Sequence, residues 1–370
     1  MTVNIVHGRR DDFLRPLQIV SGIVARNAQM PILGNVLIRK SGSELALLSS
    51  DGDMQITTMA AIGFGEDVAA TTVAARKLGE IVRALPEGGQ VKLSLSAERL
   101  LVQSGKSRFQ LQVLPAEQFP VLKSPEEWDA HVTLPQKTLR QLIELVHFSM
   151  ASNDIRYYLN GLLLRLDGTR VIAVTTDGHR LSYAHAEVEE RMERRELILP
   201  SKVVLELKRQ LEMVDEPVEL LFAGQQLRCN VGDTVLDFKA VEGKFPSYER
   251  VIPTANPNML AVDRMELRQS LHRAALLTDD KHHVVRCRFR PGVASFTATN
   301  PTQEEAEEEL EIEYDGAEIE IALNVQYLLA VLDNLAVEKV SIAMLDGSSS
   351  ILCTIPERDD FKYVLMPVRA

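Results

Sequence analysis

The segment 175–181, which reads TTDGHRL, holds the residue types that come closest to a catalytic pair. Asp177 and His179 stand two residues apart, and a carboxylate beside an imidazole is suited to general acid–base catalysis. No nucleophile in a recognisable motif accompanies them, and Asp-x-His is a common turn sequence. The segment raises a hydrolase or nuclease hypothesis, but we favour the turn and expect no catalytic residue.

The cysteines and histidines do not form a metal-binding pattern. Cys229, Cys287 and Cys353 lie far apart without a CxxC pair, so we expect neither a disulfide framework nor a zinc site. His282 and His283 are adjacent, but no third ligand is apparent. The chain also lacks the P-loop signature GxxxxGK[ST]. We therefore predict no metal, no cofactor and no enzymatic activity, and any ATP-driven step would belong to a partner.

The elements that position these residues recur along the chain. At 370 residues, the chain exceeds the roughly 250–300 at which a single core stops growing, so two or three domains are expected. In each third, a Leu-Arg pair opens an apolar pattern at helical spacing. These pairs, spaced by 125 and 128 residues, are Leu14-Arg15, Leu139-Arg140 and Leu267-Arg268. Each third therefore begins with an amphipathic helix.

Each third then continues in the same order. A short apolar strand, a turn and a second strand precede a second helix, which we expect from Ala75, Ser201 and Asn324, and alternating strands close the unit. Solenoid repeats span only ~20–50 residues, whereas ~125 residues make a whole domain. We predict an α+β fold of three tandem domains at 1–130, 131–255 and 256–370, each with two helices packed on antiparallel sheet.

The distribution of charge qualifies the net value of −11, which would by itself count against a nucleic-acid partner. The three predicted domains carry 14 basic and 14 acidic groups, 16 and 18, and 11 and 20, so their charges are 0, −2 and −9. Most of the acidity thus lies in the last third. The start MTVNIVHGRRDDF lacks an apolar leader, and the three cysteines suit a reducing compartment, so we expect a cytoplasmic protein.

Five phrases in order, RYYLNGLLL, TTDGHRL, EGKFPSYERVIP, NPTQEEAEEE and YVLMPVR, make the chain resemble the bacterial beta sliding clamps of DNA polymerase III. The similarity covers essentially the whole chain. It implies a head-to-tail homodimer, a six-domain ring that encircles duplex DNA without sequence preference and tethers the replicative polymerase. The implied partners are the polymerase alpha subunit, the clamp loader, and other polymerases and repair proteins that bind through short linear motifs, with no membrane partner.

The resemblance implies a groove for peptides rich in Gln and Leu or Phe. Its predicted residues, here called the predicted peptide site, are Leu159, Thr176, Gly178, His179, Leu181, Pro246, Arg250, Val251, Asn324, Tyr327, Ser350, Val364, Met366, Pro367, Val368 and Arg369. Leu, Met, Val and Pro supply an apolar slot, and Arg and His can orient a peptide. Some of these residues could instead be core, above all Leu159 and Met366.

The resemblance also implies DNA contacts and a dimer junction. The implied DNA contacts are Arg26, Arg76, Arg83, Arg156, Tyr157, Arg180 and Lys202, and Arg10 is a further lumen candidate. For each of the cations on helices, an ordinary solvated helix face is an equally good interpretation, and for Arg156 and Tyr157 the alternative is packing. The junction would join Lys77, Phe109 and Leu111 of one chain to Leu276, Leu277, Glu304, Glu307 and Glu308 of the other. Opposite ends of unlike charge suit such an interface.

Three positions depart from the family pattern. The family typically has an aromatic where His282 stands, Arg is frequent at Asn27, and the terminus VRA lacks a bulky last residue. A specialised clamp serving repair or drug resistance is a rival to a replicative clamp, beside the hydrolase hypothesis.

Overall fold

The computed structural model describes residues 2–24, 30–65, 68–96, 98–279 and 281–368. The chain divides into two compact units, one of residues 1–137 and 209–240, the other of residues 138–208 and 241–370. The middle third of the sequence is thus shared between the two units. Within the described residues, none of the helices is long and apolar enough to cross a membrane.

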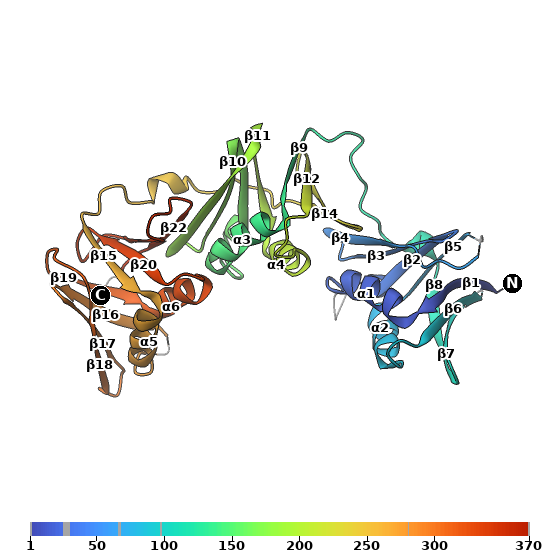
Figure 1. The fold of residues 1–370 in the computed structure, drawn as a ribbon, viewed down its shortest axis with the longest axis horizontal. Coiled ribbons are helices and arrows are strands. Elements are labelled where there is room, and N and C mark those ends of the chain that lie inside the picture. Colours follow the sequence, from blue (N-terminus) through green and yellow to red (C-terminus); the bar gives the residue numbers. More distant parts are fainter. Residues whose placement is uncertain (1, 25–29, 66–67, 97, 280, 369–370) are drawn as a thin grey trace. The chain divides into compact units, whose positions relative to one another are not determined.

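The first unit is built on a 12-stranded sheet with the order β1-β6-β7-β8-β5-β2-β3-β4-β14-β13-β12-β9. Its helices α1 (Arg10–Ser21) and α2 (Ala75–Ala84) contact each other, and α1 also packs on β3 and β4 (Figure 1). The strands are β1 (Val3–Arg9), β2 (Asn35–Ser41), β3 (Glu44–Ser50), β4 (Met54–Ala60), β5 (Val68–Ala74), β6 (Gln90–Ser96), β7 (Arg99–Ser104), β8 (Ser107–Leu114), β9 (Ala130–Pro135), β12 (Pro217–Ala223), β13 (Gln226–Val231) and β14 (Thr234–Lys239).

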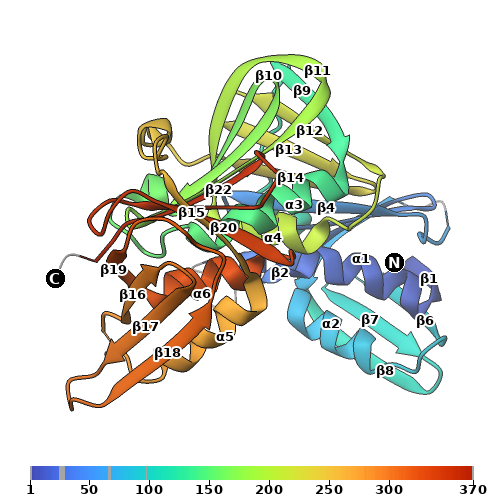
Figure 2. The same cartoon turned by 60° about the vertical axis from the view of Figure 1, so that its left-hand side comes forward.

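The second unit contains a six-stranded sheet, β10-β11-β22-β21-β20-β15, and a four-stranded sheet, β18-β17-β16-β19. Its helices are α3 (Gln136–Val146), α4 (Ser201–Gln210), α5 (Arg264–Ala275) and α6 (Val325–Asn334). Its strands are β10 (Gly161–Thr176), β11 (Arg180–Pro200), β15 (Asn258–Asp263), β16 (Val284–Arg290), β17 (Val293–Thr299), β18 (Glu305–Glu311), β19 (Ile319–Asn324), β20 (Lys339–Met344), β21 (Ile351–Thr354) and β22 (Phe361–Leu365). Figure 2 shows α5 and α6 side by side against these strands.

Within the part of the chain that the structure describes, six α-helices fall where the apolar spacing predicted them, two in each third. Five strands that directly precede helices were not predicted from the sequence. These strands are β1, β9 and β15 before the first helices and β5 and β19 before the second helices of the outer thirds. The turn expected between the first two strands of the middle third is also not a break, because Gly168 pairs with Met192 and β10 continues through two register shifts. The middle third therefore carries a long β10–β11 hairpin in place of two short strands.

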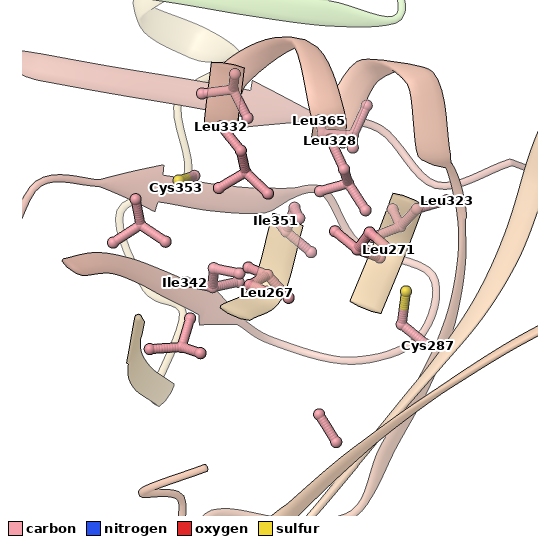
Figure 3. Close-up of a cluster of buried hydrophobic side chains, with 14 of the residues drawn as sticks. Leu267, Leu271, Cys287, Leu323, Leu328, Leu332, Ile342, Ile351, Cys353 and Leu365 are labelled. Atoms are coloured by element: carbon pink, nitrogen blue, oxygen red, sulfur yellow. The ribbon is translucent and has the colours of Figure 1, made fainter. Parts of the chain in front are cut away.

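In the last third, both helices bury their apolar residues against strands of two sheets. Leu267 and Leu271 of α5 and Leu328 and Leu332 of α6 are buried among strand residues of both sheets of the second unit (Figure 3). Each helix alternates these apolar positions with polar ones at three- and four-residue spacing, so one stripe faces the strands. Cys287 and Cys353 lie in the same core, where burial raises the pKa of both thiols to about 12.

In each third, the residue that starts the first helix binds main-chain groups at the end of the second helix. Arg10 donates from Nε to the Val82 carbonyl at 3.0 Å and from Nη2 to the Arg83 carbonyl at 2.7 Å. Arg264 donates to the Leu332 and Val337 carbonyls, both at 2.8 Å. In the middle third, the Gln136 side-chain oxygen accepts from the Glu212 amide at 3.2 Å. These contacts satisfy carbonyls or amides that a helix end leaves free.

This capping corrects the prediction that Arg10 faces a DNA lumen. Its side chain is only 8% exposed, and it also pairs with Asp11 at 2.7 Å. The sequence marked Arg10 as basic and helical, but the hydrogen bonds that bury it come from residues more than seventy positions away.

Replacing Arg264 with methionine is expected to lower the free energy of unfolding by about 2–3 kcal/mol, because two carbonyls lose their donors. Urea denaturation followed by circular dichroism measures this. Arg268→Met is the matched control, since Arg268 lies one turn along the same helix and forms a partly exposed pair with Asp333. An equal loss in both variants would contradict the capping role.

Candidate functional site

The Asp177–His179 pair belongs to a turn that occurs in every third. Asp177 Oδ1 accepts from the His179 and Arg180 amides at 2.9 and 3.0 Å, and Gly178 adopts φ 91°. In the first third, Asp51 accepts from the Asp53 and Met54 amides at 3.0 and 2.8 Å. Asn300 accepts likewise from the Thr302 and Glu304 amides at 3.1 and 2.9 Å. An Asx turn therefore explains the carboxylate at position 177 without catalysis.

The side chains of Asp177 and His179 are engaged with other residues. Asp177 Oδ2 accepts from Arg180 Nε at 3.0 Å, and the His179 ring is stacked on Tyr327 with centroids 6.5 Å apart and planes at 22°. The Arg180 guanidinium lies 4.3 Å from the Tyr327 ring centroid. The turn thus presents His179 and Arg180 to helix α6, where Tyr327 serves as their common platform.

The C-terminal strand continues this surface from the last third. β22 pairs with β11 so that Leu181 lies opposite Val364, and the Met366 amide then donates to the His179 carbonyl at 2.9 Å. The Val368 amide donates to the Ala322 carbonyl at 2.9 Å. Main-chain hydrogen bonds therefore tie the turn 175–181 to strand β22 and the residues after it, and tie those residues to β19, within one unit.

The members of the predicted peptide site divide into a buried floor and an exposed rim. Leu159, Thr176, Leu181 and Val364 are buried, at 2%, 8%, 3% and 0% exposure, and belong to the floor. Met366 is 37% exposed, so it is not core, whereas Leu159 is. The members that are exposed or half-buried are Gly178, His179, Pro246, Arg250, Val251, Asn324, Tyr327, Ser350, Met366, Pro367 and Val368. Arg369 lies outside the described residues.

Hydrogen bonds between asparagine side chains and the main chain fix Asn324 and Ser350 in place. Asn324 caps α6 by accepting from the Gln326 and Tyr327 amides at 2.9 and 3.2 Å, and it donates to the His282 carbonyl at 3.1 Å. Asn256 donates to the Ser350 carbonyl at 3.1 Å. His282, the departure noted in the sequence, thus lies at the N-terminus of α6, with its side chain 70% exposed.

Phe245 and the packing role of Arg180 were not predicted from the sequence. Phe245 is 7% exposed and packs in one cluster with Leu181 and Val364. Arg180 was predicted to contact DNA, but its side chain is only 12% exposed and is held by Asp177 and Tyr327. The DNA contact of Arg180 stays a prediction, and its position in the structure is beside the predicted peptide site.

The other predicted DNA contacts lie on helices and on one loop. Arg76 is exposed and pairs with Glu80 at 2.9 Å on α2, and Arg83 is exposed on the same helix. Lys202 is exposed on α4. Arg156 pairs with Asp154 at 2.8 Å and donates to the Asp177 carbonyl at 3.2 Å, beside Tyr157, which is 57% exposed. Arg26 lies outside the described residues.

The residues predicted at a dimer junction lie on β8, on and just before β18, on α2 and just after α5. Phe109 and Leu111 lie on β8, which pairs with β7 along its length but with β5 only at Leu114 and Val113. Glu307 and Glu308 lie on β18, an end strand of its sheet. Lys77 and Leu276 are exposed, Leu277 is half-buried, and Glu304 lies in the turn before β18. The acidic run is thus an ordered edge strand, with Glu308 paired to Arg273 at 2.6 Å.

Neighbouring thirds are joined by the same strand pairing. β4 of the first third pairs with β14 so that Gln55 lies opposite Asp237. β11 of the middle third pairs with β22 so that Leu181 lies opposite Val364. Leu181 follows Gln55 by 126 residues and Val364 follows Asp237 by 127, so the two pairings share one register. Each joins the strand after the Asx turn of one third to the last strand of the next.

Comparison with known families matches the whole chain to one protein. The N-terminal, central and C-terminal domains of the DNA polymerase III beta subunit match residues 5–123, 133–247 and 249–369, in that order. The chain belongs to the bacterial beta sliding clamp family. The resemblance read from the five phrases is therefore confirmed, as is the α+β fold of three clamp domains.

Relatives and solved structures agree with this family over the full length. The beta sliding clamp of Proteus mirabilis is 41% identical over 364 residues, covering 97% of this chain and 98% of the relative. That of Escherichia coli K12 is 40% identical over 362 residues, with the same coverage. The Pseudomonas aeruginosa beta subunit structure superposes with a TM-score of 0.95 at 36% identity and covers 100% of both chains. As a sliding clamp, the protein serves polymerase processivity in DNA replication.

Proposed function

We propose that two copies of this beta sliding clamp close head to tail into a ring around duplex DNA. Three domains per chain, at 1–130, 131–255 and 256–370, would give six in the ring. Partners would dock at the predicted peptide site. Because a closed ring is retained on DNA by enclosure, it needs no tight phosphate contact, which would oppose sliding. The observation that carries this proposal is the shared register of the two internal domain junctions.

The strand pairing that joins neighbouring domains within the chain can also form between two chains. β18 corresponds to β4 and β11, because each follows an Asx turn, and β8 corresponds to β14 and β22, because each ends its third. Carrying the shared register over places Glu305 opposite Gln110, Phe109 opposite Ala306 and Arg108 opposite Glu307. Arg108 and Glu307 have opposite charge, which favours this pairing over others. A strand edge that pairs with another chain is also protected from nonspecific aggregation.

The DNA-facing part of the proposal rests on exposed cations on helices. Arg76, Arg83 and Lys202 are exposed on α2 and α4, while the acidic residues of β18 lie on a strand. Arg156 and Tyr157 would contact DNA from the loop beside the predicted peptide site, where an exposed tyrosine can stack on an unpaired base. Mild, scattered positive charge agrees with a clamp that slides.

The peptide part rests on the buried floor and exposed rim described above. Val251, Met366 and Pro367 are exposed or half-buried and offer apolar surface, Leu181 and Val364 are buried, and His179 and Arg250 are exposed. A short linear motif of the polymerase alpha subunit, the clamp loader, another polymerase or a repair protein would place its Leu or Phe on this apolar surface. Affinity should be modest, since a flexible tail must be ordered on binding. We further propose that the protein acts in the cytoplasm without catalysis.

Retention on circular DNA tests the ring directly. After loading with the host clamp loader and ATP, the clamp is expected to stay on nicked circular plasmid through gel filtration and to be lost when the plasmid is linearised. Light scattering on the free protein should give twice the mass of the 41.3 kDa chain. A monomer that leaves both DNA forms equally would refute the ring. Processive synthesis with the host replicative polymerase would separate a replicative clamp from a specialised one.

A further inference from the structure

The segment 241–252 carries Pro246, Arg250 and Val251 of the predicted peptide site with little main-chain support. Among the described residues, it joins the sheets only through the bridge between Val241 and Ile198. Its one short 3-10 helix, Tyr248–Arg250, is closed by hydrogen bonds from the Arg250 and Val251 amides at 3.3 and 3.0 Å. Side chains must therefore hold this segment in place on the face of β10 and β11.

Two aromatic side chains and one arginine supply that anchorage. Phe245 and Tyr248 are 7% and 3% exposed and pack in the cluster that contains Leu181 and Val364. Arg165 of β10 contacts the same segment through Tyr248 and Glu249. Its Nη1 donates to the Tyr248 hydroxyl at 3.0 Å and to Glu249 Oε1 at 2.8 Å, and its guanidinium lies 5.0 Å from the Tyr248 ring centroid.

The arginine is itself oriented by a second carboxylate. Arg165 Nε donates to Glu196 Oε2 of β11 at 3.1 Å, and the Arg165 side chain is only 10% exposed. Burial acts to raise the pKa of Glu249, but the Arg165 hydrogen bond keeps that pKa below its usual value, so the pair is ionised at neutral pH. A planar guanidinium can hold a carboxylate on one side and a hydroxyl, ring and second carboxylate on the others.

We propose that Arg165 is a positioning residue for the predicted peptide site. It holds the segment 241–252 so that Pro246, Arg250 and Val251 stand ready before a peptide arrives. This inference rests on the peptide-binding function proposed above. When a binding-competent conformation is only partly populated, the apparent affinity falls by the populated fraction, so loss of the anchor weakens binding without removing a contact to the peptide.

Fluorescence anisotropy with the labelled peptide Gln-Leu-Ser-Leu-Phe tests this on the full-length clamp. Arg165→Met is expected to weaken binding about tenfold. Stopped-flow mixing should assign most of the change to slower association. Arg165→Lys, which keeps the charge but not the planar fork, should recover part of the affinity. Glu249→Gln should also weaken peptide binding. Because the Glu249 side chain is 54% exposed, this substitution removes the ion pair without disturbing folding.

The matched control is Arg170→Met on the same strand, where Arg170 pairs with Glu187 at 2.7 Å and both side chains are at least half exposed. Its peptide affinity should equal that of the unaltered clamp. If the unaltered clamp does not bind the peptide, the proposed function fails. If it binds and Arg165→Met and Glu249→Gln bind equally well, the positioning role is refuted. Equal weakening by Arg165→Lys and Arg165→Met, with loss of retention on circular DNA, would also refute it, because it indicates general damage.

Discussion

Replacing Phe109 with aspartate is expected to convert the clamp dimer into monomers and to abolish retention on circular DNA. Phe109 is 37% exposed on the open edge of β8, and the proposed pairing would bury it opposite Ala306. A carboxylate buried there without a partner costs about 3 kcal/mol or more, so the dimer dissociation constant should rise at least about a hundredfold. Sedimentation or light scattering across a concentration series measures the change.

The control for this prediction is Met259→Asp, because Met259 is 60% exposed on β15, which belongs to a different sheet from β8 and from β18. It should leave the dimer intact. The register is tested separately by charge reversal. Arg108→Glu should weaken the dimer, and Glu307→Arg in the same chain should restore it, because the proposed register places the two side chains opposite each other. Failure of the double variant to recover would reject that register, even if Phe109→Asp behaves as expected.

Replacing His179 with alanine is expected to weaken binding of the Gln-Leu-Ser-Leu-Phe peptide by roughly tenfold or more and to leave retention on circular DNA unchanged. The His179 ring is exposed and stacked on Tyr327, so its removal deletes rim surface without opening the core. Processive synthesis by the host polymerase should fall with peptide affinity. Anisotropy and primer-extension length measure the two effects.

The same variant separates a clamp from a hydrolase or nuclease. If Asp177 and His179 formed an acid–base pair, the unaltered protein would cleave DNA or an ester substrate and His179→Ala would lose that activity. The engaged geometry of Asp177, which accepts from two amides and from Arg180, argues for the turn. His131→Ala is the control, since His131 is also exposed but lies on β9. It should change neither peptide binding nor DNA retention.

The sequence determined the helices and the threefold repeat, because their evidence is local. Leu14, Leu139 and Leu267 begin amphipathic stripes that any core would bury, and the repeat is visible in the order of such stripes. The turn at Asp177 was also within reach, since an Asx turn needs only neighbouring amides. The strands before the helices and the continuous β10 were not, because strand pairing depends on residues distant in the chain.

Only the tertiary structure decided which basic residues are exposed and which are structural. The neighbouring sequence does not distinguish Arg10, Arg165 and Arg180 from exposed arginines, yet each is nearly buried in the structure. Whether an arginine faces water or caps a helix depends on carbonyls, rings and carboxylates brought to it by folding. The apolar pattern of the sequence therefore predicts a domain that is repeated three times. The roles of its basic residues depend on contacts between segments that are far apart in the sequence.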